Sequence, residues 1–212
     1  MQSFITIKEN IQAEIIERKS KFICNLIKIE SQEEAEQTIK QIKKKYHDAR
    51  HNCVAYRVFE NETILEKSSD DGEPSGTAGA PMLNILQKNN LCNVVVVVTR
   101  YFGGILLGTG GLVRAYSDSL IKAIEEAEII EKCQGIEGEA ILEYNNLETF
   151  KHYCKTNQIF IENCEYTDKI VCKIQLEESQ KEQLFIDFET KKVNLIDLKF
   201  LSKTLINKSI IK

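Results

Sequence analysis

Hydrophobic and polar positions in the first 134 residues alternate between helical and extended spacing. Residues 31–34 read Ser-Gln-Glu-Glu, a capping box that opens a predicted helix. The apolar face of this helix is formed by Ala35, Ile39, Ile42 and Tyr46. Residues 22–29 before it predict one strand, and residues 53–59 and 63–67 after it predict a hairpin.

Five consecutive valines, residues 94–98, form the most uniform apolar run in the chain. Stiff β-branched residues without polar alternation are typical of a central strand that is covered on both faces. A short helix is predicted before this strand, over residues 78–88, and a longer one after it, over residues 112–127. The first part of the chain is therefore expected to be a β-α domain.

A second pattern begins near Gly135. Strands are expected at residues 136–144, 159–166, 169–176 and 193–201, with one helix capped by Asn146 and another opened by a capping box at residues 179–182. This βαββαβ order predicts a ferredoxin-like domain. The expected domains are residues 1–134 and 135–212. No glycine- or serine-rich linker separates them, so we expect limited freedom between them.

Eight of the ten glycines and both prolines fall between Gly72 and Gly111. One part of this segment reads DGEPSGTAGAP (residues 71–81), and another reads TRYFGGILLGTGGLVRAY (residues 99–116). Residues that permit unusual backbone geometry mark loops, and loops on a rigid scaffold often carry function.

These two motifs resemble the signature of the IMPACT/YigZ family. The similarity extends to RKSKF (residues 18–22) and HNCVAYR (residues 51–57), and the layout resembles the bacterial two-domain form. The resemblance implies an α+β protein. Its amino-terminal domain would have the fold of the second domain of a small-subunit ribosomal protein. Its carboxy-terminal domain would be similar to the last domain of elongation factor G. The resemblance also implies a link to translational control.

Charge and cysteine content narrow the function classes. The formal net charge is -4, with 17 basic and 19 acidic residues up to Gln134 and 11 and 13 after it, so neither half is cationic. Nucleic acid would have to be bound through a local patch. The seven cysteines form no C-x-x-C pair, which favours reduced thiols. Without a signal-like start or a long apolar run, we expect a cytoplasmic protein with no membrane partner.

The segment from Thr99 to Gly111 leaves a strand and enters a helix, a topology that directs backbone N–H groups towards an anion. Arg100 and Arg114 flank the segment and offer charge-assisted hydrogen bonds, while Tyr101 and Phe102 offer stacking surfaces. Standard nucleotide motifs fail here, because Thr109-Gly110 stands where a Walker loop has Lys-Ser/Thr. The alternative is that the glycines serve only close packing and positive φ.

The acidic loop allows three interpretations. Asp70, Asp71 and Glu73 supply oxygen ligands for a divalent metal, although their spacing matches no calcium loop. A solvated turn at Asp71-Gly72, with Ser75 or Thr77 capping the next helix, is the simpler interpretation. A third is an ion pair with Arg100 or Arg114. We predict no bound metal or cofactor.

Enzymatic interpretations are also open. His51 could act as a base for Ser69, Ser75 or Thr77, and Cys53 could be an activated thiol. His47 and His51 have metal-ligand spacing only if one helix contains both. Arg50, Arg57, Arg100 and Arg114 would form a local positive groove if the fold brings them together.

The predicted function is that of a non-enzymatic binding and regulatory protein linked to translation, which contacts ribosome, RNA or a translation factor through the glycine-rich loop. The alternatives are an enzyme acting on a phosphorylated small molecule or nucleotide, and a protein–protein adaptor. The predicted ligand- or partner-binding residues are Arg57, Asp71, Glu73, Ser75, Thr77, Arg100, Tyr101, Phe102, Gly103, Gly104, Gly108, Gly110, Gly111 and Arg114.

Overall fold

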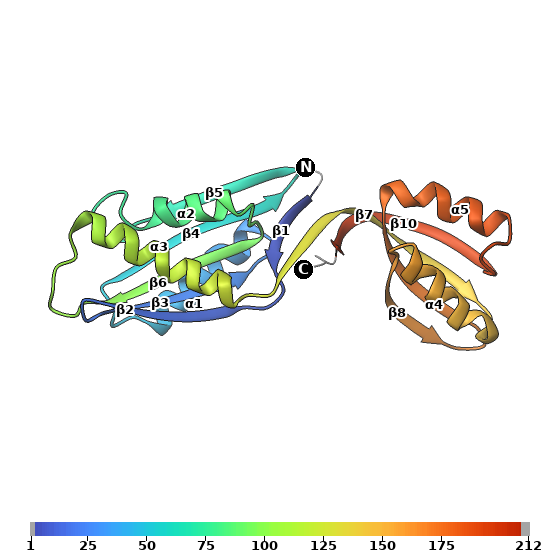
Figure 1. The fold of residues 1–212 in the computed structure, drawn as a ribbon, viewed down its shortest axis with the longest axis horizontal. Helices are drawn as coiled ribbons and strands as arrows, with labels where there is room; N and C mark the ends of the chain where they lie inside the picture. Colours follow the sequence, from blue (N-terminus) through green and yellow to red (C-terminus); the bar gives the residue numbers. More distant parts are fainter. Residues whose placement is uncertain (1–2, 209–212) are drawn as a thin grey trace. The chain divides into compact units, whose positions relative to one another are not determined.

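The computed structural model describes residues 3–208, which divide into two compact units, Ser3–Glu131 and residues 132–208. Strand β7 (Ile129–Leu142) begins in the first unit and continues in the second. The mixed α+β class expected from the sequence is confirmed (Figure 1).

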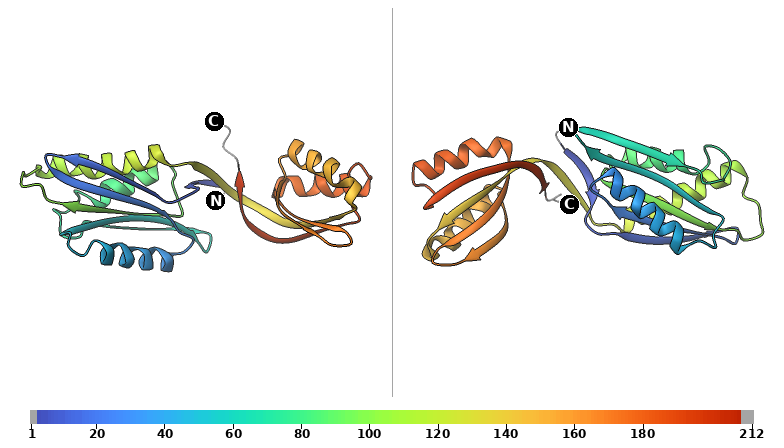
Figure 2. Two further views of the ribbon diagram at one scale, coloured as in Figure 1. Left: turned by 90° about the horizontal axis from the view of Figure 1, so that it is seen from below. Right: turned by 180° about the vertical axis from the view of Figure 1, so that it is seen from behind.

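The first unit is built on a five-stranded antiparallel sheet with the order β2-β3-β6-β4-β5. Its strands are β2 (Ile11–Glu17), β3 (Ser20–Lys28), β4 (His51–Glu60), β5 (Thr63–Ser69) and β6 (Val94–Tyr101). The two helices α2 (Gly79–Lys88) and α3 (Gly108–Glu126) cover one face, and α1 (Gln32–Lys45) covers the other (Figures 1 and 2).

The valine run is the central strand, as predicted. Val94, Val96 and Val98 belong to the core beneath α2 and α3, whereas Val95 and Val97 belong to the core beneath α1. All five side chains are fully buried. Because successive residues of a strand face opposite sides, an unbroken apolar run is what a doubly covered strand requires.

Helix α1 also follows the prediction, with one change at its start. The Ser31 hydroxyl accepts a hydrogen bond from the Glu34 backbone N–H at 3.1 Å. The Glu34 carboxylate accepts from the backbone N–H of Glu30 at 2.7 Å, one residue before the position expected in a capping box. Both orphan donors are satisfied, so the helix start is fixed.

Other boundaries differ from the predictions. Strands β1 (Ser3–Ile7) and β2 precede the predicted first strand, and the turn between β2 and β3 consists of Arg18 and Lys19, both at positive φ. A tight hairpin turn of this kind usually contains Asn or Gly, so the sequence carried no turn signal here. Helix α3 begins four residues before the predicted position, and β6 continues to Tyr101. The connecting loop is therefore only residues 102–107.

The second unit has the predicted βαββαβ order. After β7 come α4 (Leu147–Thr156), β8 (Phe160–Tyr166), β9 (Ile170–Glu177), α5 (Lys181–Glu189) and β10 (Asp197–Lys208). Strand β7 pairs with β9 and with β10, and β8 pairs with β9 at the edge. This connectivity is that of a ferredoxin-like fold.

The predicted caps of the second unit are wrong in detail. Asn146 precedes α4 but makes no side-chain cap, because a short 3-10 turn, Tyr144–Asn146, leads directly into the helix. Before α5, the capping box is formed by Glu177 and Gln180 rather than by Ser179 and Glu182. The box lies on the 3-10 turn Glu178–Gln180, which the spacing of the sequence did not reveal.

Candidate functional site

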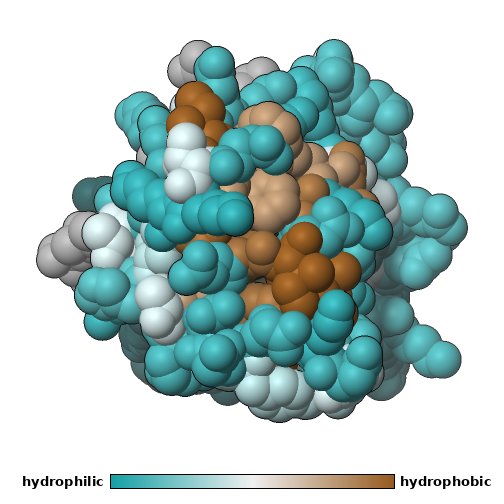
Figure 3. Space-filling model, turned by 90° about the vertical axis from the view of Figure 1, so that its right-hand side faces the viewer, coloured by the Kyte–Doolittle hydropathy of each residue, from teal (hydrophilic) through white to brown (hydrophobic). Residues whose placement is uncertain are grey.

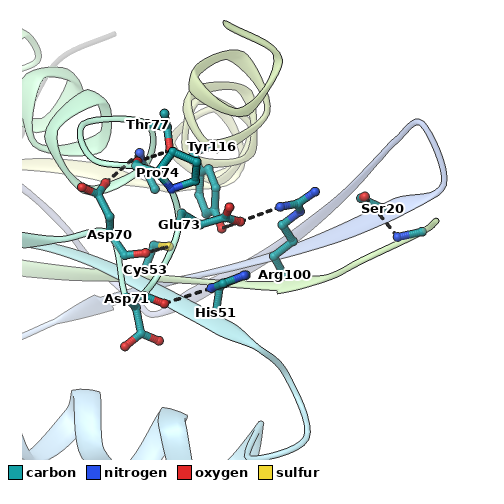
Figure 4. Close-up of polar contacts among 12 residues, drawn as sticks. Ser20, His51, Cys53, Asp70, Asp71, Glu73, Pro74, Thr77, Arg100 and Tyr116 are labelled. Atoms are coloured by element: carbon teal, nitrogen blue, oxygen red, sulfur yellow. Dashed lines mark hydrogen bonds and ion pairs between the residues drawn. The ribbon is translucent and has the colours of Figure 1, made fainter. Parts of the chain in front are cut away.

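Three segments meet where β6 leaves the sheet: the β2–β3 turn, the acidic loop of residues 70–77, and residues 102–107. The strand register brings them together, since Arg100 of β6 lies opposite both Phe22 of β3 and His51 of β4. Figure 4 shows the acidic loop, Arg100 and Ser20 at this end of the first unit. We call this region the β6–α3 site.

A buried ionic network lies at the centre of the site. The Glu73 carboxylate accepts hydrogen bonds from Arg100 Nη1 at 2.7 Å and from the Tyr116 hydroxyl at 2.9 Å (Figure 4). Burial, followed by the neighbouring Cys53 and Glu73, raises the pKa of Tyr116, so the phenol stays protonated and donates. The pairing considered for the acidic loop therefore occurs, with Arg100 as partner. Arg114 is exposed, and its Nε donates to the Gly110 carbonyl at 3.4 Å.

Arg100 has the environment of a structural side chain. Its guanidinium lies 5.5 Å from the centre of the Phe22 ring and 5.7 Å from that of Phe102, distances at which a cation attracts a ring face. Only 7% of the residue is exposed, and its buried Nε has no hydrogen-bond partner among the residues that the structure describes. Arg100 thus connects the acidic loop to Phe102 and supports residue 102 from below the surface.

Asp70 organises the acidic loop. Asp71 and Gly72 form the predicted turn, both at positive φ, and the Glu73 N–H donates to the Asp70 carbonyl at 2.9 Å. The Asp70 carboxylate accepts from the N–H groups of Gly76, Ala78 and Gly79 at 2.8–2.9 Å. Partial burial opposes ionisation, but these three donors outweigh it and hold the pKa of Asp70 below its usual value.

Asp70 therefore caps α2, and the prediction that Ser75 or Thr77 would do so is wrong. The Thr77 hydroxyl instead donates to the Pro74 carbonyl at 2.6 Å, and Ser75 is exposed. A carboxylate eight and nine residues upstream of the capped N–H groups fills the positive end of this helix. An external anion is thus excluded from the start of α2.

The candidate catalytic and metal-binding groups are engaged elsewhere. His51 Nδ1 lies 2.9 Å from the Asp71 carbonyl oxygen, and the Asp71 carboxylate accepts from the Asn52 N–H at 2.7 Å and from Lys43 Nζ at 2.5 Å. Burial raises the pKa of the Cys53 thiol to about 12. Helix α1 ends at Lys45, before His47. Within residues 3–208, no cluster of three or more His, Cys, Asp or Glu side chains is arranged to hold a metal.

The loop of residues 102–107 packs on the β2–β3 turn while exposing apolar side chains. Gly103 N–H donates to Ser20 Oγ at 3.2 Å, and a Cβ on Gly103 would overlap the Lys19 carbonyl group. Phe102 is 51% exposed and Leu106 81% exposed. The loop is therefore anchored to the β2–β3 turn at Gly103 and presents Phe102 and Leu106 to solvent.

Helix α3 starts beside this loop with an open N-terminus. In the described part of the chain, no side-chain cap is found at its N-terminus, whereas the Asp70 carboxylate caps α2. A hollow of about 270 Å³ lies between the start of α3 and the β2–β3 turn. It is lined by Ile15, Glu17, Arg18, Leu107, Gly111, Arg114, Ala115 and Asp118. Gly108, Gly110 and Gly111, predicted as loop residues, form the first turn of α3.

Some of the predicted site residues are not together. Arg57 lies opposite Val94, six positions along β6 from Arg100, which corresponds to about 20 Å. Its guanidinium pairs with Glu66 at 2.7 Å and donates to two backbone carbonyls. The groove of four converging arginines therefore does not form. Tyr101 is directed to the loop after α1, where its hydroxyl donates to Asp48 at 2.8 Å.

Sequence reasoning missed Arg18 and Lys19 as site residues, although the RKSKF motif contains them. Both are exposed, and they lie beside the loop of residues 102–107 because of the contact between Lys19 and Gly103. The signal that could have placed them is the pairing of two quoted motifs, RKSKF and RYFGG, on neighbouring strands.

The second unit has hollows of its own. One of about 340 Å³ lies between α4 and residues 192–194, with Phe150, Tyr153 and Val193 among its lining residues. Figure 3 views the molecule from the side on which α4 and α5 are drawn and shows hydrophobic side chains gathered within a polar surround.

Comparison with known proteins identifies the family to which the chain belongs. Residues 18–124 match the Impact N-terminal domain, and residues 141–184 match a domain of unknown function, DUF1949. The chain belongs to the IMPACT family.

Individual relatives support the assignment. The chain is 38% identical over 180 residues to the IMPACT family member YvyE of Bacillus subtilis, covering 85% of this chain and 82% of YvyE. It is 39% identical over 131 residues to the IMPACT family member YigZ of Escherichia coli, covering 61% of this chain and 64% of YigZ. A crystal structure of a hypothetical protein superimposes with a TM-score of 0.62 at 29% identity, covering 95% of this chain and 98% of that one. Across residues 3–208, no helix has both the length and the apolar character needed to cross a membrane.

Proposed function

We propose that this chain is a non-catalytic regulatory protein of translation that binds ribosomal RNA on the ribosome through the β6–α3 site. The observation that carries the proposal is the loop of residues 102–107, which is anchored at Gly103 and exposes Phe102 and Leu106 next to an uncapped helix start. The translational setting rests on the resemblance to the IMPACT family.

The polar surroundings of the loop suit a phosphate backbone. Arg18, Lys19 and Arg114 are exposed around it, and the first N–H groups of α3 have no side-chain cap in the described chain. Cations and a helix N-terminus bind phosphate oxygens, and an exposed aromatic ring stacks on an unpaired base. Glu17 and Asp118 line the same hollow, so the local positive charge is modest and binding should be weak at high salt.

Catalysis has less support than binding. A nucleophile requires a base within hydrogen-bond reach, yet His51 faces the Asp71 carbonyl and the Thr77 hydroxyl donates to Pro74. The buried Glu73 and Arg100 neutralise one another. These groups stabilise the loop from inside, which is the role of a scaffold beneath a binding surface.

Co-sedimentation with ribosomes and with free ribosomal RNA, over a series of salt concentrations, tests the proposal. An Arg18→Ala/Arg114→Ala variant removes two phosphate contacts and should lower the slope of log K against log salt by about 1.4–1.8. The matched control is Lys88→Ala/Lys122→Ala, two exposed lysines outside the site, which should leave the slope unchanged. Equal slopes for all three proteins, or no binding at low salt, would contradict the proposal.

A further inference from the structure

Two thiols of the second unit face each other across neighbouring strands. Cys164 of β8 and Cys172 of β9 are register partners in the antiparallel pair, and their Sγ atoms are 2.9 Å apart. Both thiols lie on the side of the sheet covered by α4, where Cys172 is part of the core and Cys164 packs against it. The proposed RNA-binding function makes no use of this pair.

The strand register places the two Cα atoms within the range of separations that a disulfide spans. Directly opposed residues in an antiparallel pair have Cα atoms about 4.5–5.5 Å apart, and disulfides span Cα separations of about 4.4–6.8 Å. Closing the S–S bond therefore requires rotation of the side chains and no movement of the strands.

We propose that Cys164 and Cys172 are a redox modification site that forms a reversible intramolecular disulfide with a hydroperoxide as oxidant. The two thiols differ in access: Cys164 is partly exposed on the edge strand β8, whereas Cys172 is fully buried. Cys164 is thus the thiol that meets the oxidant, and Cys172 is the thiol that resolves the product.

The chemistry balances in two steps. The Cys164 thiolate attacks one peroxide oxygen, the O–O bond breaks, and the products are a sulfenic acid on Cys164 and an alcohol or water. The Cys172 sulfur then attacks the Cys164 sulfur, and the S–O bond breaks. The hydroxyl takes up the proton that Cys172 releases and leaves as water. The two thiols lose two electrons in total, and the peroxide gains them. A small thiol such as glutathione reverses the reaction.

The surroundings favour this pair over other cysteines. Burial, followed by contact with Cys164, raises the pKa of Cys172, which keeps it a protonated resolving thiol until the sulfenic acid forms. The Lys151 ammonium on α4 is paired with Glu148 at 2.8 Å, and it lowers the pKa of Cys172 by less than burial raises it. The third nearby thiol, Cys154, is 1% exposed on α4, and burial raises its pKa to about 12.

The consequence of oxidation would be local. The bond would tie edge strand β8 to β9 just after the register shift between Ile161 and Asn163, where the ladder is interrupted. An edge strand next to a bulge opens more readily than a central one, so the link should slow its opening. Backbone amides of β8 should exchange with solvent more slowly in the oxidised chain, and those of β6 should not change.

The test uses the full chain treated with hydrogen peroxide, alkylated to block remaining thiols, and digested with trypsin without reductant. Cleavage after Lys155, Lys169 and Lys173 places Cys164 in residues 156–169 and Cys172 in residues 170–173. Cys154 is in a third peptide, residues 152–155. Each possible disulfide among the three thiols therefore gives a different linked pair of peptides.

We expect the 156–169 and 170–173 peptides to be joined after oxidation and separated by glutathione, in the wild type and in the Cys154→Ser control. Cys172→Ser should leave Cys164 as a sulfenic acid that a dimedone probe labels, and Cys164→Ser should leave Cys172 unmodified. A linkage through Cys154, or oxidation of Cys172 in the Cys164→Ser variant, would overturn the proposal. So would unlinked peptides at peroxide levels that oxidise Cys164.

Discussion

The buried pair of Glu73 and Arg100 supports the most quantitative prediction. The carboxylate side chain is 3% exposed and the guanidinium 8% exposed, with 2.7 Å between Oε1 and Nη1. Glu73→Gln removes the negative charge but keeps the size of the side chain. Arg100 would then remain buried without a counter-charge, between the rings of Phe22 and Phe102.

The expected loss in the free energy of unfolding comes from the buried charge that is left without a partner. Removing one partner of a buried ion pair destabilises by about 3–5 kcal/mol. The weaker hydrogen bond from Tyr116 to a neutral acceptor adds roughly 1 kcal/mol, and the retained attraction of Arg100 to the two rings offsets a similar amount. We predict a loss of about 3–5 kcal/mol for Glu73→Gln and for Arg100→Met. The double variant should lose about 0–2 kcal/mol, because neither charge is then left alone.

The free energy must be measured in the first unit alone. The chain contains no tryptophan, so we would follow hydrogen exchange by mass spectrometry in urea, using peptides of β6. The control is Lys21→Gln, which breaks an exposed pair with Glu14 on the same sheet, where the side chains are 43% and 42% exposed. Lys21→Gln should change the free energy of unfolding by less than about 1 kcal/mol.

Losses of unfolding free energy that add between the single and double variants would refute the reasoning. If each single variant lost under about 1 kcal/mol and the double variant lost their sum, Glu73 and Arg100 would not act as a buried pair. The support of Phe102 by Arg100 would then have no basis.

Three further predictions concern the loops. Gly103→Ala should destabilise the first unit by about 1–3 kcal/mol, because its Cβ would overlap the Lys19 carbonyl. The control Gly110→Ala places its Cβ in open space and should not destabilise the unit. Hydrogen exchange of β6 compares the free energies of unfolding of the two variants. Asp70→Asn should destabilise at neutral pH. The pKa of Asp70 is lowered in the folded state, so its contribution is present above about pH 4 and fades as pH falls, and urea titrations should converge in acid. Arg18→Asn/Lys19→Gly should stabilise by about 1 kcal/mol, since both positions have positive φ, while co-sedimentation with ribosomes weakens.

Local signals in the sequence predicted the elements whose environment is local. The valine run specifies a doubly covered strand, because side chains on both faces of the strand need apolar neighbours. Ser31 caps α1, the helix that begins at the next residue. The βαββαβ order followed from spacing alone. The second domain's caps were misassigned because two 3-10 turns moved the helix starts.

Features that depend on how separate segments come together in the fold could not be predicted from the sequence. Asp70 caps α2 from eight and nine residues away, and only the turn at Asp71 brings its carboxylate back. Arg57 and Arg100 lie at opposite ends of a strand pairing, which their shared residue type does not reveal. The facing thiols of Cys164 and Cys172 likewise require a register that a one-residue slip would destroy.

Site-specific photo-crosslinking from position 106 tests the central claim most directly. Leu106 is 81% exposed, so a photoreactive phenylalanine analogue there should not disturb the fold, and Ile121, 41% exposed further along α3, is the matched control position. We predict crosslinks from position 106 to ribosomal RNA in intact ribosomes at physiological salt, with none from position 121. Equal yields from both positions, or products that contain only protein, would contradict an RNA-binding β6–α3 site.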